Sequence, residues 1–81
     1  MANHLIKIKK IYFMRLIEEQ KKFEVRLNDR DYQVGDVLDF LILADDMKIE
    51  YGDVPFRIIY VHHGLGMAEN YVVLGVEAIK K

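Results

Sequence analysis

The sequence predicts a small, mainly β domain of the α+β class, with one or two helices and about five to six short antiparallel strands in a barrel. Three observations lead to this prediction. Short apolar or alternating segments recur along the 81 residues and are separated by turn-forming residues. Apolar residues at helical spacing occur in one stretch near the start. No linker, repeat or low-complexity tract interrupts the pattern, so we expect residues 1–81 to form a single domain.

The chain is predicted to begin with a strand and a helix. Residues 4–9 alternate between polar and apolar side chains, which is typical of a short strand. Residues 11–20 place their apolar side chains at approximately helical spacing, which indicates a helix of about two to three turns.

Residues 22–27 alternate again and predict a second strand with one apolar and one polar face. The apolar face carries Phe23, Val25 and Leu27. The polar face carries Lys22, Glu24 and Arg26, and Asn28 continues it. Residues two apart on a strand lie roughly 6–7 Å from each other on the same side, so charges of both signs are presented in one row.

The next strand is predicted at residues 37–44, which are apolar except for Asp39. Such a run is typical of a strand covered on both faces or placed inside a barrel. The turn that precedes it contains Gly35 and Asp36. Two further turns are expected at residues 45–47 and 51–53, with a short edge segment between them.

Two more strands complete the predicted sheet. Residues 55–63 begin with proline, which is compatible with a strand start or a sheet edge. Their alternation places Phe56, Ile58, Tyr60 and His62 on one face. A glycine-bearing loop follows, and residues 71–76 form the closing strand.

Composition excludes several classes of protein. The chain has no cysteine, which excludes a disulfide framework and a zinc site with cysteine ligands. No apolar run approaches the roughly 20 residues that cross a bilayer, and the first residues lack the pattern of a secretory signal, so we expect a cytoplasmic protein without membrane contact.

The charge is small overall but unevenly distributed. A net charge of −1 argues against non-specific coating of nucleic acid. Residues 1–30 nevertheless contain eight Lys or Arg and four Asp or Glu, whereas residues 31–81 contain four and nine. The basic group consists of Lys7, Lys9, Lys10, Arg15, Lys21, Lys22, Arg26 and Arg30. It either forms one positive patch, if the first helix and second strand are adjacent, or consists of ordinary solvated side chains.

The stretch from Lys21 to Asp36 resembles the signature of ASCH-type domains in the PUA-like superfamily, Gly-x-Lys-x-x-Glu-x-Arg followed shortly by Gly-Asp. Lys21, Glu24 and Arg26 match it, as does the later Gly-Asp pair. Glu19 stands where the family has glycine, the residue that enters positive φ freely. The resemblance implies a small PUA-like barrel.

Residues 23–36 are most similar to a small, often phage-associated branch of that superfamily that is described only as a domain of unknown function. Residues 4–7, 12–13 and 70–74 have counterparts in the same branch, with Asn70 in place of glycine. The resemblance therefore covers nearly the whole chain.

The resemblance implies a cleft beside the barrel that takes RNA or a nucleotide-like ligand. Arginine and lysine suit phosphate, and arginine also stacks on bases. The candidate nucleic-acid-binding residues are Lys21, Lys22, Glu24, Arg26, Asn28, Arg30 and Tyr32. The alternative for the motif is a Glu24–Arg26 ion pair on an exposed sheet face, worth at most about 1 kcal/mol.

Other candidate residues lie outside the motif. Residues 28–31 predict a turn in which Arg30 either pairs with a neighbouring aspartate or reaches the cleft. Tyr32 and Tyr51 are the candidates for base stacking. His62 and His63 are neighbours on a strand and point to opposite faces, so we expect no metal site; one of them could face the cleft.

Three functions are compatible with these residues. The first is a module that binds single-stranded RNA or a modified base, without a cofactor. The second is a hydrolase of modified nucleosides, in which Lys21 activates a nucleophile and Glu24 moves the proton. Related amidohydrolases have threonine where Glu24 stands, and this chain has no Ser, Thr or Cys. The third is a partner-binding phage accessory domain that uses a strand edge near Pro55.

Overall fold

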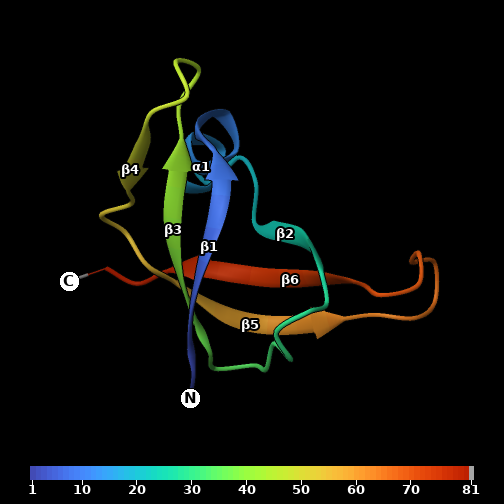
Figure 1. The fold of residues 1–81 in the computed structure, drawn as a ribbon. Helices are drawn as coiled ribbons and strands as arrows, with labels where there is room; N and C mark the ends of the chain where they lie inside the picture. Colours follow the sequence, from blue (N-terminus) through green and yellow to red (C-terminus); the bar gives the residue numbers. More distant parts are fainter. Residues whose placement is uncertain (81) are drawn as a thin grey trace.

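The computed structural model describes residues 1–80, which form six strands and one helix (Figure 1). The predicted α+β class, mainly β with one helix near the start, is confirmed. The sheet curls into a half-barrel and does not close completely. The elements are β1 (Asn3–Lys9), α1 (Lys10–Ile17), β2 (Phe23–Leu27), β3 (Val37–Leu43), β4 (Ile49–Tyr51), β5 (Phe56–His62) and β6 (Tyr71–Ala78).

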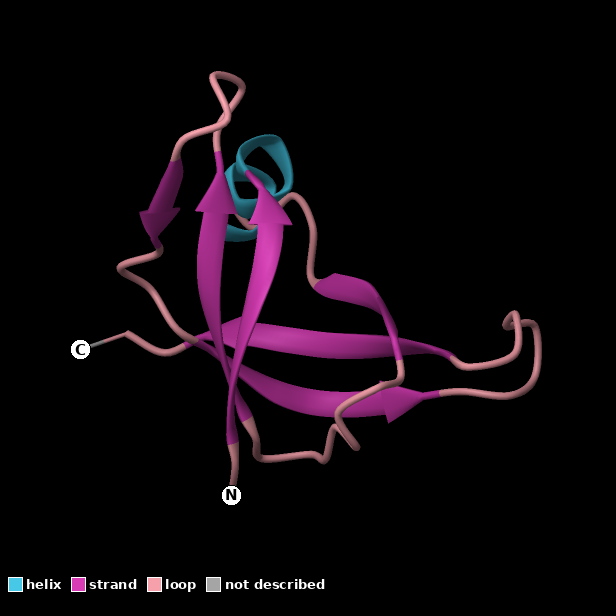
Figure 2. Ribbon diagram, in the orientation of Figure 1, coloured by secondary structure: helices cyan, strands magenta, loops and turns pink. Residues whose placement is uncertain are grey.

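The strands follow the order β1-β3-β5-β6-β2. β4 pairs with the end of β3, along the same edge that pairs with β5 at the start of β3. β1 and β3 are parallel, so the prediction of antiparallel strands was wrong for this pair. The remaining pairs are antiparallel as predicted. Parallel neighbours need a long crossover, which α1, β2 and the following loop provide. In Figure 2 the β1–β3 pair crosses the β5–β6 pair at a steep angle, and the helix lies beside the upper ends of β1 and β3.

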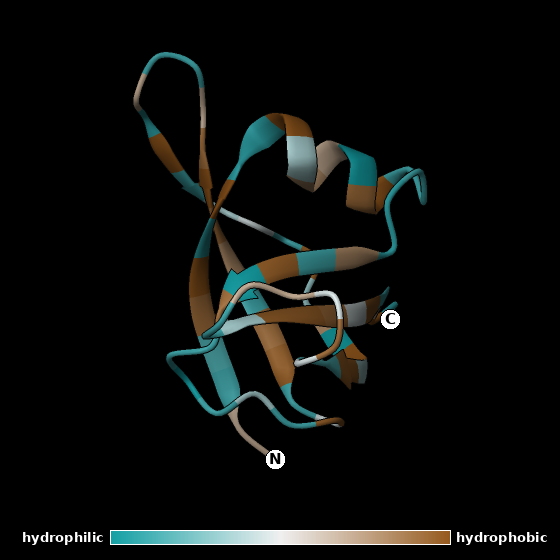
Figure 3. Ribbon diagram, turned by 90° about the vertical axis from the view of Figure 1, so that its right-hand side faces the viewer, coloured by the Kyte–Doolittle hydropathy of each residue, from teal (hydrophilic) through white to brown (hydrophobic). Residues whose placement is uncertain are grey.

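The inward-facing side chains of the strands, two residues of α1 and Tyr32 of the loop after β2 form one core. The rings of Phe13, Phe40 and Phe56 meet edge to face, with centroids 5.7–6.3 Å apart. On β3, alternate residues are buried and the others are half-buried, which agrees with the predicted coverage of both faces. The alternation of apolar and polar residues along the strands is visible in Figure 3. The core residues are Ile6, Ile8, Phe13, Leu16, Tyr32, Leu38, Phe40, Ile42, Phe56, Ile58, Val72, Leu74 and Val76.

β5 departs from the predicted alternation. A bulge at Ile59 shifts the register between Ile58 and Tyr60, so Ile58 is fully buried whereas Tyr60 is 63% exposed. The prediction that Phe56, Ile58, Tyr60 and His62 share one face was therefore wrong. The extra residue turns the second half of the strand over, which no period-two pattern can indicate.

The prediction of a free strand edge near Pro55 was also wrong. The first residues of β5 pair with β3 on one side and with β6 on the other. The N–H of Ile79 donates to the Pro55 carbonyl at 2.9 Å. Proline therefore precedes a central strand, and the ends of the main strand order are β1 and β2.

The helix ends at Ile17, three residues before the predicted boundary, in a turn stabilised by two backbone hydrogen bonds. The N–H of Glu19 donates to Leu16 O at 3.2 Å, and that of Gln20 donates to Arg15 O at 2.9 Å. This is the Schellman arrangement, which places the residue after the C-cap in the left-handed region. Glu19 has φ +61°, so glutamate adopts here the conformation that glycine provides in the resembling family.

No helix within residues 1–80 is long and apolar enough to span a bilayer.

Candidate functional site

β2 turns its polar face inward and its apolar face outward. Phe23, Val25 and Leu27 are 46–49% exposed, whereas Glu24 is 4% exposed. Glu24 lies opposite Leu74 and Arg26 opposite Val72, and both β6 partners are fully buried. The sequence predicted two faces of opposite character, and the structure places the charged one against the interior of the half-barrel.

The buried Glu24 carboxylate is neutralised by two cations. Lys21 Nζ donates to Glu24 Oε1, and Arg26 Nη1 lies 3.8 Å from Glu24 Oε2. The Lys21 ammonium also lies 5.0 Å from the Tyr12 ring centroid and 5.5 Å from that of Phe23. The Glu24–Arg26 ion pair expected as the alternative is therefore present, but its expected place on an exposed sheet face was wrong, because the carboxylate is buried. The pairing with two cations compensates this burial.

Two arginines, one on β2 and one in the loop after it, hydrogen-bond to the backbone of β1. Arg26 Nη1 donates to Lys7 O at 2.8 Å, and Arg30 Nη1 donates to Leu5 O at 2.7 Å. The guanidinium groups therefore satisfy carbonyls on the edge of β1 that faces away from β3. Both alternatives expected for Arg30 were wrong. Within residues 1–80 it makes no ion pair with a neighbouring aspartate, and it lines a separate hollow with His4 and Asp36 instead of the one that contains Arg26.

A hollow of about 450 Å³ lies along this junction, and we call it the seam hollow. It is lined by Lys7, Ile8, Lys9, Tyr12, Lys21, Glu24, Val25 and Arg26. Four cationic residues from β1, β2 and the preceding turn therefore line the same hollow as one carboxylate and one aromatic ring. Of these four, Lys21 and Arg26 contact the Glu24 carboxylate. The structure brings together the three motif residues that the sequence singled out.

The sequence pattern of one known family, a domain of unknown function (DUF3850), matches residues 3–76. The chain belongs to the DUF3850 family. A solved structure described as "Crystal structure of hypothetical protein PH0355" is similar to it, with a TM-score of 0.64 and 15% sequence identity. The match covers 98% of this chain and 100% of that one, and at this identity it shows the fold alone. No curated protein matches the chain.

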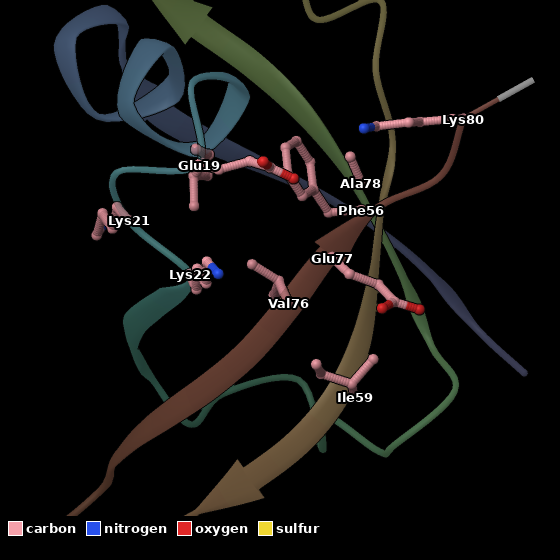
Figure 4. A pocket seen from close by; sticks show the side chains of 10 residues that line it. Glu19, Lys21, Lys22, Phe56, Ile59, Val76, Glu77, Ala78 and Lys80 are labelled. Carbon is pink, nitrogen blue, oxygen red and sulfur yellow. The ribbon is translucent and has the colours of Figure 1, made fainter.

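The other predicted site residues of the DUF3850 domain do not line the seam hollow. Lys22 borders a larger hollow of about 570 Å³ at the end of α1, which Figure 4 shows with Glu19 and Lys80 at its rim. Asn28 lines a third hollow, of about 340 Å³, together with Tyr32. The predicted nucleic-acid-binding set is thus divided among separate surfaces.

Neither predicted stacking residue lies at the seam hollow. Tyr32 is 4% exposed and packs edge to face on His4, with ring centroids 4.8 Å apart. The prediction that Tyr32 offers a stacking surface was wrong, because its ring belongs to the core despite its polar neighbours in sequence. Tyr51 is 78% exposed but lies on β4, which pairs with β3 and does not contribute to the seam hollow.

The histidines do not face the seam hollow either. His62 Nε2 hydrogen-bonds to Leu65 O at 2.9 Å, and His63 lines the hollow that contains Tyr32. The expectation that one of them faces the cleft is therefore wrong for the seam hollow. Within residues 1–80, no group of three or more His, Asp or Glu side chains could hold a metal ion.

The predicted turn at Gly35 and Asp36 has a structural role. Gly35 has φ +96°, and Asp36 is buried. The Asp36 carboxylate accepts hydrogen bonds from His4 Nε2 at 2.8 Å, Ala2 N at 3.0 Å and Gln33 N at 3.1 Å. The bond from His4 and then that from Ala2 lower the pKa of Asp36, against the opposing effect of burial. This carboxylate fastens the start of β1 to the turn before β3.

Sequence analysis did not assign Lys7, Lys9 and Tyr12 to the site. The signal for the lysines was present, because they share one face of β1 and belong to the basic group of residues 1–30. Tyr12 was not among the tyrosines expected to stack on a base, yet it is 41% exposed. Its position follows from the angle between α1 and the sheet, which the sequence does not contain.

Proposed function

We propose that this DUF3850 domain binds single-stranded RNA or a nucleotide-like ligand in the seam hollow. The observation that carries the proposal is that four cationic residues and a half-exposed aromatic ring line one hollow. The volume of about 450 Å³ falls in the range of small-ligand pockets, roughly 300–1,000 Å³.

The cations suit a phosphate group. Lys7 and Lys9 are exposed and lie on the same face of β1, so both ammonium groups are available to a ligand at the mouth of the hollow. The Lys21 and Arg26 side chains are 20% and 25% exposed and are held in place by Glu24. In this proposal Glu24 orients its basic neighbours, and the exposed lysines make the first contact with phosphate.

Tyr12 suits a base. Its ring lines the hollow and is 41% exposed, and stacking of an unpaired base on such a ring contributes roughly 1–3 kcal/mol. Recognition of unpaired nucleic acid combines phosphate contacts with stacking, and this hollow offers groups for both. The match of Lys21, Glu24 and Arg26 to the ASCH-type signature supports the same proposal, which includes membership of the PUA-like superfamily and a cytoplasmic location.

A hydrolase is supported less well. The chain has no Ser, Thr or Cys, so the nucleophile would be a water molecule or a Lys, Asp, Glu, Tyr or His side chain. Lys21 already donates to the Glu24 carboxylate, and an ammonium in that pairing has no lone pair to offer. The pair therefore favours binding over proton transfer.

Fluorescence anisotropy with labelled short single-stranded RNA tests the proposal. Lys9→Ala and Tyr12→Ala remove a cation and a ring from the hollow without touching the buried Glu24. Each is expected to weaken binding about five- to tenfold or more, and affinity should fall as salt rises. Lys48→Ala is the matched control, because Lys48 is exposed in the turn before β4 and outside the hollow.

The proposal fails if the parent protein binds neither RNA nor nucleoside monophosphates at low salt. It also fails if Lys48→Ala weakens binding as much as Lys9→Ala, because the effect would then report net charge and not a site. Turnover of N-acylated nucleosides by the parent protein, lost in Lys21→Ala, would assign the hollow to the hydrolase.

A further inference from the structure

The outward side of the β5–β6–β2 layer is apolar. Six large side chains on it are between 44% and 63% exposed, and we call them the outer apolar face. They are Phe23, Val25, Leu27, Ile59, Tyr60 and Tyr71. The three β2 residues belong to this face because the polar side of β2, with Glu24, is turned toward the interior. The other three come from β5 and β6.

Strand register makes the face continuous. Val25 lies opposite Val73, and Leu27 lies opposite Tyr71. Phe23 lies opposite Gly75, which is in turn opposite Tyr60. The β5 bulge adds to the face, because a Cβ placed on Gly75 would lie 3.1 Å from Tyr60 Cβ and 3.7 Å from Ile59 Cγ1. Glycine at this position lets both β5 side chains cover the middle of the layer.

The exposed area is large for a chain of this length. With about 150–250 Å² for a large side chain, the exposed parts of the six residues amount to roughly 600 Å². That equals the largest apolar patches found on ordinary monomers, about 300–600 Å². The half-buried Val73 and the rim residues His62, Arg57 and Glu77 would bring the area near the roughly 800 Å² per partner of a stable complex.

The composition of the face suits a second copy of the same chain. None of its six side chains is ionised, so two copies placed face to face bring no like charges together. Arg57 and Glu77 lie opposite each other in the β5–β6 register at one end of the layer, where they contribute both signs to a polar rim. An apolar centre with a polar rim is the usual anatomy of a homodimer interface.

We propose that the protein forms a symmetric homodimer in which the outer apolar faces of two copies pack against each other. The two layers then lie about 10 Å apart, as in a β-sandwich. The dimer does not depend on the proposed ligand, although the two features adjoin, since Phe23 belongs to the face and its ring lies 5.5 Å from the Lys21 ammonium.

Sedimentation equilibrium of the full chain tests the proposal. The parent protein is expected to be dimeric at micromolar concentration. Val25→Lys places an ammonium at the centre of the face and is expected to raise the dissociation constant at least about tenfold, because the charge would be buried without a partner. Met47→Lys is the control, because Met47 is 77% exposed in the β3–β4 turn and carries the same change of charge.

A parent protein that stays monomeric at high micromolar concentration overturns the proposal, and binding of that monomer to lipid vesicles would give the face another occupant. Equal dimerisation of Val25→Lys and the parent also overturns it, since the interface would lie elsewhere. If Val25→Lys fails to fold by circular dichroism, Tyr60→Lys replaces it, because Tyr60 is the most exposed residue of the face. Loss of the dimer in that variant, with the Met47→Lys dimer intact, supports the proposal.

Discussion

On β2, Glu24 is 4% exposed and its neighbour Val25 is 49% exposed, although a carboxylate costs far more to bury than an isopropyl group. Lys21 and Arg26 pair with the Glu24 carboxylate and so compensate the cost of its burial. A β1 carbonyl that accepts a hydrogen bond from Arg26 holds the guanidinium in place. The outer face has no comparable partners within residues 1–80. The difference teaches that hydrophobicity alone does not decide which side of an end strand faces the interior.

The largest expected effect on stability comes from replacing Glu24, and it is compared with replacement of its neighbour Val25. Glu24→Gln leaves Lys21 and Arg26 without their anion, and we expect a loss of about 2–3 kcal/mol in the free energy of unfolding. The loss stays below that of a fully buried pair because both cations remain partly accessible to water. Val25→Thr should change stability by less than about 0.5 kcal/mol at a concentration where the chain is monomeric. Urea unfolding measures both, and equal effects would contradict the contrast between the faces.

A second buried carboxylate extends the comparison to pH. The pKa of Asp36 is lowered from its ordinary value of 3.8, so its contribution to stability is complete above that value. As pH falls through the lower pKa of the native state, the carboxylate takes up a proton and the contribution is lost. Thermal unfolding between neutral pH and about pH 2 should therefore show a steep fall in stability below about pH 4.

Asp36→Asn isolates this contribution. The variant should be less stable than the parent at neutral pH, and the gap between them should narrow as the pH falls below 4. Parallel curves for parent and variant across the whole range would show that Asp36 does not carry the effect.

The smallest expected effect on stability comes from the turn between α1 and β2. Glu19 has φ +61°, where a residue with a Cβ is strained by roughly 1–2 kcal/mol. Glu19→Gly should raise the free energy of unfolding by about 0.5–1 kcal/mol after allowance for the freedom that glycine adds to the unfolded chain. Ala in the same place should give no such gain, which distinguishes relief of strain from loss of the carboxylate.

Much of the fold could be predicted from local pattern. The apolar run of β3, the helix before β2 and the turns around β4 each depend on neighbouring residues, and their order gives a mainly β half-barrel. Two features could not be predicted. The bulge at Ile59 depends on Gly75 of the facing strand β6. The inward orientation of the polar side of β2 depends on a β1 carbonyl that accepts a hydrogen bond from Arg26. Both depend on residues far apart in the chain.

The three motif residues of the candidate site were predicted, whereas the residues of β1 and α1 that line the same hollow were not. The resemblance to the ASCH-type signature singled out Lys21, Glu24 and Arg26, which the structure places in contact. Strand spacing alone grouped Lys22, and not Lys21, with Glu24 and Arg26. Tyr32 was assigned wrongly because its polar neighbours in sequence concealed its contact with His4. Tyr12 was missed because its exposure depends on how α1 lies against the sheet.

The most direct test of the central claim, that the inward polar face of β2 forms a ligand site, is an NMR titration of the backbone amides with short single-stranded RNA. We expect shift changes to concentrate on residues that line the seam hollow, namely Lys7, Ile8, Lys9, Tyr12, Lys21, Glu24 and Arg26. Residues 44–51, around β4, should stay unchanged. Shift changes confined to β4, β5 and β6, or no changes at low salt, would contradict this expectation.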